Sequence, residues 1–368
     1  MAIIPVYEPN ITENDIEQIG WAARSGWVSS LGEFIIQFEE AFARFCQTQF
    51  ALTVSNGTAA LHLALISLDI GEGDEVIIPD LTFVATANAV TYTGARVVPV
   101  EIDPDTLCLS PVAFEAAITS RTKAVIPVHL YGHPAEMVAI CAIAGHYGIR
   151  VIEDAAEAHG AEAHGRRVGS FGDFGAFSFY ANKLITTGEG GMLTTNDPVL
   201  YERAKFLRDH AMSRNRRYWH TEVGYNYRIT NLQAALGCSQ LQRIDQILRS
   251  KREVFTSYYS QLASLPGISL NRCALWANSV YWMVNVEHQE WNEASRDNIM
   301  AQLKQFGVDS RPYFYPISDL PMYQDTSVAT PIAHSISKRG INLPSSPTLL
   351  KSDIDRVCNA LRKIIGYP

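Results

Sequence analysis

The 368-residue chain lacks the sequence marks of several large protein classes. No run approaches the roughly 18 uninterrupted apolar residues of a membrane span, and residues 1–5 have neither a basic region nor an apolar signal segment. The six cysteines stand singly, without the paired spacing of a disulfide framework or a zinc site. We therefore expect a cytoplasmic protein with reduced thiols packed inside, no membrane partner and no bound metal.

Several nucleotide-binding and hydrolase motifs are also missing. The chain has no Gly-Lys dipeptide, and hence no P-loop, and it has no G-x-G-x-x-G, H-E-x-x-H or G-x-S-x-G pattern. His129 and His133 are four residues apart, but Gly132 and Pro134 argue against a helical metal-binding face, so we expect structural roles for both. The net charge of −8 argues against a nucleic-acid partner.

What is present is the composition of a globular protein, with 47% apolar and 18% charged residues. At roughly 150 residues per domain, the length predicts two domains or one large one. Alternating apolar runs and amphipathic stretches in the first half predict βαβ units and a largely parallel sheet. The expected strands are 75–78, 96–100, 124–128 and 150–153.

Three helices are expected, two in the N-terminal part of the chain and one after residue 230. Residues 58–68 carry apolar side chains at helical spacing, which predicts one face packed on the sheet, and Thr12 can cap a helix that runs to Gly26. A long amphipathic helix is expected over residues 232–262, followed by shorter elements. We therefore expect an α/β large domain over residues 1–243 and a small α+β domain over residues 244–368.

Two segments place polar groups at strand ends. Residues 54–61 (Val-Ser-Asn-Gly-Thr-Ala-Ala-Leu) combine a strand end, a tight turn and a helix start. Free N–H groups there suit a phosphate, although the same residues also make an ordinary capped turn. In residues 151–157 an apolar strand runs into Asp154 and Glu157. A strand-end acid such as Asp154 can keep a pyridine nitrogen protonated, or it can cap the next helix.

A third segment, residues 178–191, places Lys183 between an aromatic run and a Gly-rich turn, with no acid adjacent in sequence. Desolvation would lower the pKa of this ammonium, as a Schiff-base lysine requires, whereas a surface loop lysine is the ordinary alternative. A phosphate cradle, a strand-end acid and a desolvated lysine are together the parts that hold pyridoxal phosphate.

With these motifs the sequence resembles the DegT/DnrJ/EryC1/StrS family of pyridoxal-phosphate sugar aminotransferases, within fold type I. The resemblance extends from residues 25–30 (Ser-Gly-Trp-Val-Ser-Ser), through residues 55–61 and 153–157, to residues 224–228 (Gly-Tyr-Asn-Tyr-Arg). It implies a mostly parallel central sheet in the large domain and a homodimer with shared active sites.

The resemblance also implies residue roles. Lys183 matches the lysine that binds the cofactor, and Asp154 matches the partner of the pyridine nitrogen; these are the two catalytic positions. The other cofactor positions are Gly57, Thr58 and Ser178 at the phosphate, Glu157 near the ring hydroxyl, Phe83 stacked on the ring, and Asn226 reaching the neighbouring subunit's phosphate. Position 157 is often Gln in the family. Position 183 is Lys in this chain, whereas the dehydratase branch of the family has another residue there. Transamination is therefore the expected reaction.

Several stretches look most like the branch of the family that aminates C4 of GDP-4-keto-6-deoxy-mannose, with L-glutamate leaving as 2-oxoglutarate. They are residues 217–220, 224–231, 310–316 and 320–323. The substrate contacts that the resemblance implies are Trp27, Ser29, Arg228, Arg311, Tyr313 and Tyr315. Both tyrosines could instead be core aromatics, and Arg311 could be a structural ion-pair partner.

Other functions remain open. One alternative substrate is a dTDP- or UDP-linked 4-keto or 3-keto sugar. A different class of function is a cofactor-binding regulator or structural subunit without turnover. The acidic net charge does not exclude an anionic substrate, because residues 201–220 hold six basic and two acidic side chains, a local charge of +4.

Overall fold

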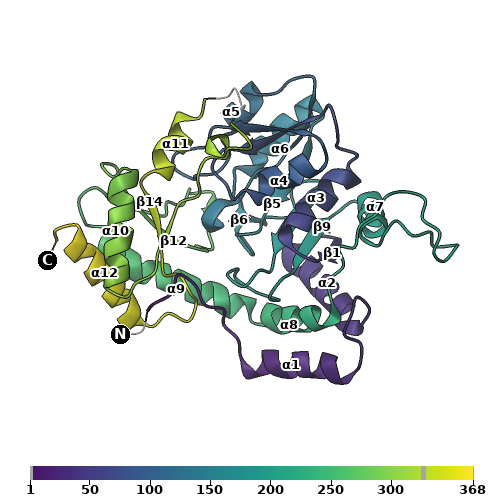
Figure 1. The fold of residues 1–368 in the computed structure, drawn as a ribbon, viewed down its shortest axis with the longest axis horizontal. Helices are drawn as coiled ribbons and strands as arrows, with labels where there is room; N and C mark the ends of the chain where they lie inside the picture. Colours follow the sequence, from purple (N-terminus) through teal and green to yellow (C-terminus); the bar gives the residue numbers. More distant parts are fainter. Residues whose placement is uncertain (1–2, 325–328, 368) are drawn as a thin grey trace.

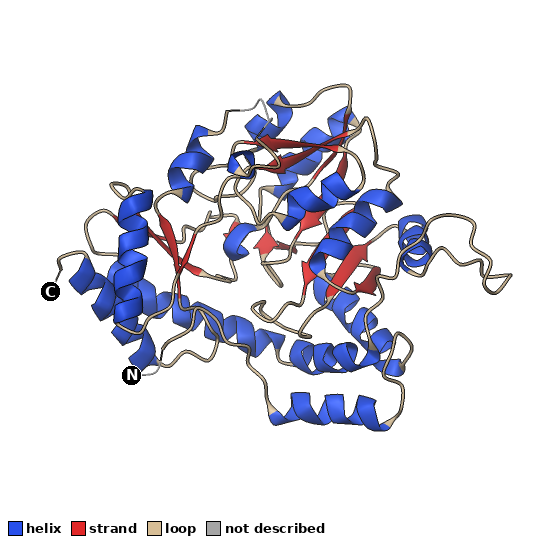
Figure 2. Ribbon diagram, viewed as in Figure 1, coloured by secondary structure: helices blue, strands red, loops and turns tan. Residues whose placement is uncertain are grey.

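The computed structural model describes residues 3–324 and 329–367. Figure 1 shows a large sheet surrounded by helices, a smaller sheet close to both termini, and the helices α8 and α9 running from one sheet to the other. The strands of the large sheet lie inside a shell of helices in Figure 2. None of the described helices is long and apolar enough to cross a bilayer.

The large sheet has the strand order β1-β9-β8-β5-β4-β2-β3. Only β9 runs against its neighbours; the pairs β8–β5, β5–β4, β4–β2 and β2–β3 are all parallel. The four expected strands are thus found as β2 to β5, although β4 spans 122–125 where 124–128 was expected, and the largely parallel sheet is confirmed. The bounds are β1 Phe50–Val54, β2 Glu75–Pro79, β3 Arg96–Val100, β4 Thr122–Val125, β5 Arg150–Asp154, β8 Phe174–Ser178 and β9 Gly191–Thr195.

Successive residues of these strands belong to different apolar cores, because side chains alternate between the two faces of a sheet. Ile77 and Val125 pack in one core with α2, whereas Val76 and Ala124 pack in the other with α3. Such two-sided burial is typical of parallel strands covered by helices. The helices are α2 Glu33–Cys46, α3 Gly57–Ser67, α4 Ala85–Tyr92, α5 Pro111–Ala116, α6 Met137–Tyr147 and α7 Pro198–Arg208.

Helix α3 differs from the expectation of one buried face. It is buried on nearly all sides, including the polar side chains of His62 and Ser67. The cause is tertiary, because α3 packs on the sheet and also contacts α4 and α7. A helix enclosed in this way is held firmly at its N-terminus, which faces the carboxyl ends of the strands.

The long helix expected over residues 232–262 is two helices, α8 (Asn231–Gln242) and α9 (Ile244–Leu262), separated at Arg243. The guanidinium of Arg243 donates hydrogen bonds to the Asp15 carboxylate and to the Asn10 carbonyl. Asp15 belongs to α1 (Glu13–Arg24), which begins after Thr12 as expected and lies along α8 on the outside of the molecule (Figure 1). The break therefore lies where α1 is tied to the helix pair.

The smaller sheet is antiparallel, in the order β10-β12-β14-β13. Its apolar core also contains Ile4, which places the N-terminal segment against the C-terminal elements. The division between residues 243 and 244 stays a prediction. The bounds are β10 Ile268–Leu270, β12 Val284–His288, β13 Arg311–Pro312, β14 Gly340–Leu343, α10 Glu293–Gln305, α11 Pro331–Ser337 and α12 Lys351–Ile364.

Short elements complete the chain. Strands β6, β7 and β11 form a third sheet, and two 3₁₀ turns connect larger elements. All six cysteines are free thiols, but Cys273 is exposed rather than packed inside as expected. The short elements are β6 Glu162–Ala163, β7 Arg166–Arg167, β11 Ala277–Asn278, η1 Leu130–Gly132 and η2 Ile317–Asp319.

Candidate active site

A cavity of about 790 Å³ opens where β5 and β8 end and α3 begins. This is the position at which open α/β sheets bind ligands, and the volume suits a molecule of cofactor size. The cavity brings together most of the cofactor positions expected from the sequence. Its lining includes Gly57, Thr58, Phe83, Asp154, Glu157, Ser178, Lys183 and Arg311.

Lys183 is the central cation of this cavity. Its Nζ lies 3.6 Å from Oε1 of Glu157 and 4.1 Å from the centre of the Trp282 ring. Burial lowers the pKa of Lys183, and the nearby carboxylates of Glu157 and Asp154 oppose that shift. The structure therefore adds what the linear sequence does not show: an acid stands beside this lysine, contributed by a different strand end.

The two carboxylates differ in their partners. Asp154 accepts a hydrogen bond from Thr86 Oγ1 (2.8 Å) at one oxygen and from the backbone N–H of Ala156 (3.2 Å) at the other. Glu157 accepts a hydrogen bond from the backbone N–H of Tyr131 (2.9 Å). Burial raises the pKa of both groups, and for Glu157 the pKa reaches about 7 although Lys183 lowers it. A cationic partner for Asp154 would offset the cost of burying its charge.

A cradle for an anion lies at the start of α3. Asn56 caps the helix by accepting a hydrogen bond from the Ala59 N–H, which leaves the N–H groups of Gly57 and Thr58 at the helix terminus. A Cβ atom added to Gly57 would lie 2.8 Å from Cβ of Ser178. The lack of a side chain at Gly57 is thus what lets this turn approach the end of β8.

Three residues that contact Asp154, Glu157 or Lys183 were not expected from the sequence: Thr86, Tyr131 and Trp282. Thr86 lies three residues after Phe83, in the first turn of α4. Tyr131 lies a few residues after the apolar strand β4 and has a φ of 53°. No sequence pattern in this segment predicts that conformation. Trp282 precedes β12 of the smaller sheet, and only the tertiary fold brings it to Lys183.

Six of the implied positions do not line the cavity, and one of these six is buried. Asn226 is exposed, and its side chain accepts a hydrogen bond from Arg228, which also pairs with Asp209. Tyr313 is only 2% exposed and packs against Tyr131, as the alternative of a core aromatic expects. The others, all exposed or half-buried on the surface, are Trp27, Ser29, Arg228 and Tyr315.

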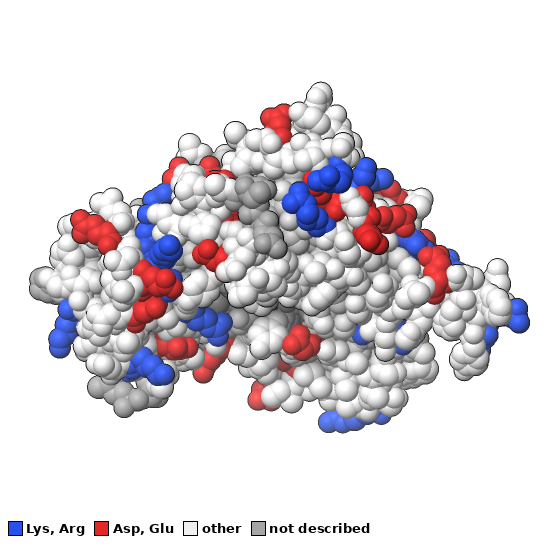
Figure 3. Space-filling model, turned by 45° about the horizontal axis from the view of Figure 1, so that its top comes forward, with Lys and Arg blue, Asp and Glu red and all other residues white. Residues whose placement is uncertain are grey.

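The basic residues of 201–220 serve other purposes than lining this cavity. Arg203 pairs with Glu222, Arg208 with Glu39, and Arg214 with Glu202. In Figure 3 acidic and basic side chains are mixed over the face drawn rather than separated. Among the lining residues, the cations are Lys183 and Arg311. Three of the six basic side chains of this stretch are thus held in ion pairs, two of them with acids that lie outside residues 201–220.

The two histidines that were expected to be structural, His129 and His133, are both buried and hydrogen-bonded. His129 lies 3.2 Å from Glu153 and accepts a hydrogen bond from the Ala135 N–H. His133 contacts the Pro134 carbonyl and the Ala274 N–H. In the described ranges, no three side chains of the metal-binding types are grouped to hold an ion.

Comparison with known proteins identifies similar sequences along nearly the whole chain. The model of the DegT/DnrJ/EryC1/StrS aminotransferase family matches residues 9–362. The GDP-perosamine synthase of Caulobacter vibrioides is 44% identical over 364 residues, with 98% of each chain covered. The GDP-perosamine synthase of Escherichia coli O157:H7 is 42% identical over 363 residues, with 99% of each chain covered.

Solved structures share the fold. S. venezuelae DesV, solved in complex with a ketimine intermediate, superposes with a TM-score of 0.93 at 36% identity and full coverage of both chains. Spr1654 of Streptococcus pneumoniae, solved in a PLP form, gives a TM-score of 0.93 at 27% identity, with 98% of each chain covered. The fold expected from the sequence, a mostly parallel α/β sheet of fold type I, is confirmed.

Proposed function

The chain belongs to the DegT/DnrJ/EryC1/StrS aminotransferase family, and from that premise we propose that it aminates C4 of GDP-4-keto-6-deoxy-D-mannose to give GDP-perosamine. L-glutamate is the proposed amino donor, and pyridoxal phosphate is the proposed cofactor. The observation that carries the proposal is the full-length similarity, at 42–44% identity, to GDP-perosamine synthases. The family resemblance read from the motifs is confirmed.

The residues of the cavity fit the cofactor at three points. The N-terminus of α3 beside Ser178 suits its phosphate, because free N–H groups and the helix dipole favour an anion. Buried Asp154 suits a protonated ring nitrogen, and Lys183 suits its aldehyde. When bound, pyridoxal phosphate supplies an electron sink that makes the Cα proton of an amino acid acidic.

In this proposal Lys183 is the acid and base of the reaction. Its Nζ takes a proton from Cα of the amino donor and later returns a proton to the sugar carbon that receives the nitrogen. A lowered pKa makes a lysine amine available as a base near neutral pH, and burial supplies that shift here. Asp154 holds the proton on the ring nitrogen, while Trp282 covers the Lys183 amine against solvent.

Arg311 supplies the second positive charge of the cavity. It enters from β13, and its charge contributes to lowering the pKa of Lys183. A planar guanidinium binds carboxylate and phosphate oxygens in pairs. We assign it to the anionic groups of the two substrates, the carboxylate of glutamate or the diphosphate of the nucleotide sugar.

The same proposal includes a cytoplasmic homodimer with shared sites. Asn226 lies outside the cavity of its own chain and is exposed, as a residue supplied to a partner must be. A group of large apolar side chains on the N-terminal segment is also exposed, and such groups mark interaction surfaces. They are Ile11, Ile16, Trp21, Trp27, Val28, Leu31 and Ile36.

A panel of GDP-, dTDP- and UDP-linked keto sugars with glutamate, scored by product mass, tests the substrate. We expect turnover with the GDP-linked 4-keto sugar, and turnover with dTDP-linked sugars alone would overturn the assignment. The Lys183→Ala variant should lose all measurable turnover, whereas Lys351→Ala, at an exposed position of α12, should keep it. A cofactor absorption band that no amino donor shifts would favour a binding subunit without turnover.

A further inference from the structure

Lys251 of α9 is a buried cation for which the proposed mechanism has no use. None of its surface is exposed, and it takes part in no ion pair among the described residues. Its Nζ donates hydrogen bonds to the backbone carbonyls of Trp282 (2.8 Å) and Ser345, and it lies 5.4 Å from the centre of the Tyr7 ring. Burying an ammonium without a carboxylate is costly, and an apolar side chain of similar size avoids that cost.

The partners of Lys251 are the residues that hold the backbone around Lys183. The Trp282 indole N–H donates to the Asn182 carbonyl at 2.6 Å, and the Tyr7 hydroxyl donates to the Lys183 carbonyl at 2.8 Å. The side chains of Trp282 and Tyr7 therefore hold two consecutive carbonyls of the segment 182–183, which we call the lysine loop. Lys251 contacts both Trp282 and Tyr7.

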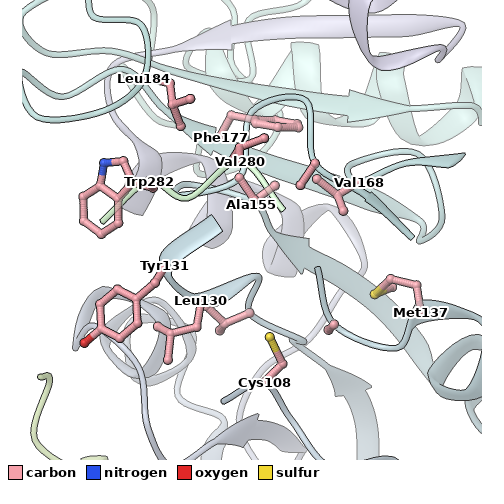
Figure 4. Close-up of a cluster of buried hydrophobic side chains, with 14 of the residues drawn as sticks. Cys108, Leu130, Tyr131, Met137, Ala155, Val168, Phe177, Leu184, Val280 and Trp282 are labelled. Atoms are coloured by element: carbon pink, nitrogen blue, oxygen red, sulfur yellow. The ribbon is translucent and has the colours of Figure 1, made fainter. Parts of the chain in front are cut away.

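Trp282 has a second contact with the reacting residue. Its ring lies 4.1 Å from Nζ of Lys183, and both residues line the cavity. It also stacks on Tyr131, with ring centres 6.4 Å apart and an angle of 13° between the planes. In the view of Figure 4 the Tyr131 ring lies below the Trp282 indole, and Leu184 lies above it. The main chain of Trp282 is thus fixed by Lys251 while its ring is fixed by Tyr131.

We propose that Lys251 is a positioning residue for Lys183: by fastening the backbone of Trp282 and the ring of Tyr7, it keeps the lysine loop in place and the indole over the reacting amine. The hydrogen bonds to two backbone carbonyls and the contact with the Tyr7 ring offset part of the cost of burying the charge. Burial lowers the pKa of Lys251 to about 7, and the neutral amine still has the hydrogens to bond both carbonyls.

The test uses the cofactor-free protein, in which the Lys183 amine is free to react. N-acetoxysuccinimide labels unprotonated amines, and peptide mass spectrometry across a pH series gives the labelling midpoint of each lysine. In the wild-type protein the Lys183 midpoint should lie below that of exposed Lys351. In Lys251→Met the Lys183 midpoint should rise by at least about one pH unit, because a mobile indole admits water to the amine.

A matched control separates positioning from general loosening. Val254→Ala removes a buried side chain one helical turn further along α9, in the core of the smaller sheet. It should lower the unfolding temperature while leaving the Lys183 midpoint unchanged. An equal shift in Val254→Ala, or no shift in Lys251→Met, would overturn the proposal. If Lys251→Met does not fold, Lys251→Gln is scored by the same criterion.

This inference rests on the proposed function, because it takes Lys183 to be the reacting amine. The two nevertheless fail in different ways. A wild-type protein that shows no lowered Lys183 midpoint and binds no pyridoxal phosphate contradicts the proposed function. A wild-type protein that shows both, with an unchanged midpoint in the Lys251 variants, contradicts the positioning role alone.

Discussion

Glu157 shows how one residue changes the electrostatics of the site. Its buried carboxyl lies 3.6 Å from the Lys183 amine, and its pKa is raised to about 7 by burial. Below that pH the group is an uncharged acid that can donate a proton, and above it the group is a counter-ion for Lys183. A glutamine at this position would have neither property.

The pH dependence of stability should reveal this group. A folded-state pKa above the unfolded value of 4.5 means that the folded protein binds more protons between pH 4.5 and 7, so stability falls as pH rises through that window. Relative to Glu157→Gln, the cofactor-free wild type should lose up to about 3 kcal/mol between pH 4.5 and 7, at about 1.4 kcal/mol per unit of pKa shift. Urea unfolding at pH 5 and pH 8 measures the difference.

Glu253→Gln, at an exposed position of α9, is the control for this experiment, and its stability relative to wild type should not change with pH. A pH-independent difference between wild type and Glu157→Gln would show that the carboxyl keeps an ordinary pKa.

Sequence reasoning found the residues of the site that lie in contiguous motifs and missed those that do not. Asp154 and Lys183 stand at the ends of apolar runs, which is a local pattern. Trp282 reaches Lys183 from more than ninety residues further along the chain, through packing between two sheets. The sequence left Tyr313 open between a substrate contact and a core aromatic for the same reason, since only the fold shows that it is buried against Tyr131.

At the scale of elements, the N-terminus of α3 is the part of the fold most suited to an anion. The helix is largely buried from Ala59 onward, whereas Gly57 and Thr58 at its start are half-buried and line the cavity. Gly57 is the position where crowding would matter, because of the nearby Ser178.

We predict that Gly57→Ala weakens phosphate binding without unfolding the protein. The new Cβ lies 2.8 Å from Cβ of Ser178, and relieving that contact displaces one wall of the cradle. Overpacking typically costs about 1–3 kcal/mol, which corresponds to a loss of about tenfold or more in affinity. Titration calorimetry with pyridoxal phosphate, and with inorganic phosphate as the smaller probe, measures the loss.

The control is Gly145→Ala in α6, where an added Cβ meets no atom within 4 Å. It should leave phosphate affinity unchanged and raise stability by up to about 1 kcal/mol, since alanine favours a helix. An affinity equal to wild type in Gly57→Ala would rule out α3 as the phosphate cradle.

Elements that depend on local sequence were predicted correctly, whereas features that depend on contacts with distant residues were not. Strands β2 to β5 are apolar runs bounded by turns, and their positions were clear. The break between α8 and α9 has no proline or glycine, because it depends on Arg243 reaching Asp15 more than two hundred residues away. The burial of α3 likewise depends on its contacts with α4 and α7, which the sequence of α3 alone does not predict.

For the whole molecule, the distribution of charge matters more than its sum. The net charge of −8 describes a protein whose cavity is nonetheless lined by Lys183 and Arg311, with acids close by. Half of the six basic side chains in the stretch 201–220 form ion pairs within the chain, and none of the stretch lines the cavity of its own chain. Binding of an anionic substrate therefore relies on two cations of one protomer, together with any residues that a second protomer contributes to the site.

Mixing two inactive variants tests whether protomers share their sites. Lys183→Ala removes the reacting amine, and Asn226→Asp places a negative charge where the proposal puts the partner's phosphate. In a mixed dimer, one site pairs both defects and the other pairs two intact residues. Random mixing of protomers should therefore restore about a quarter of wild-type activity. Each variant treated alone by the same dissociation and reassociation should stay inactive, and a mixture no more active than its components would place Asn226 outside any shared site.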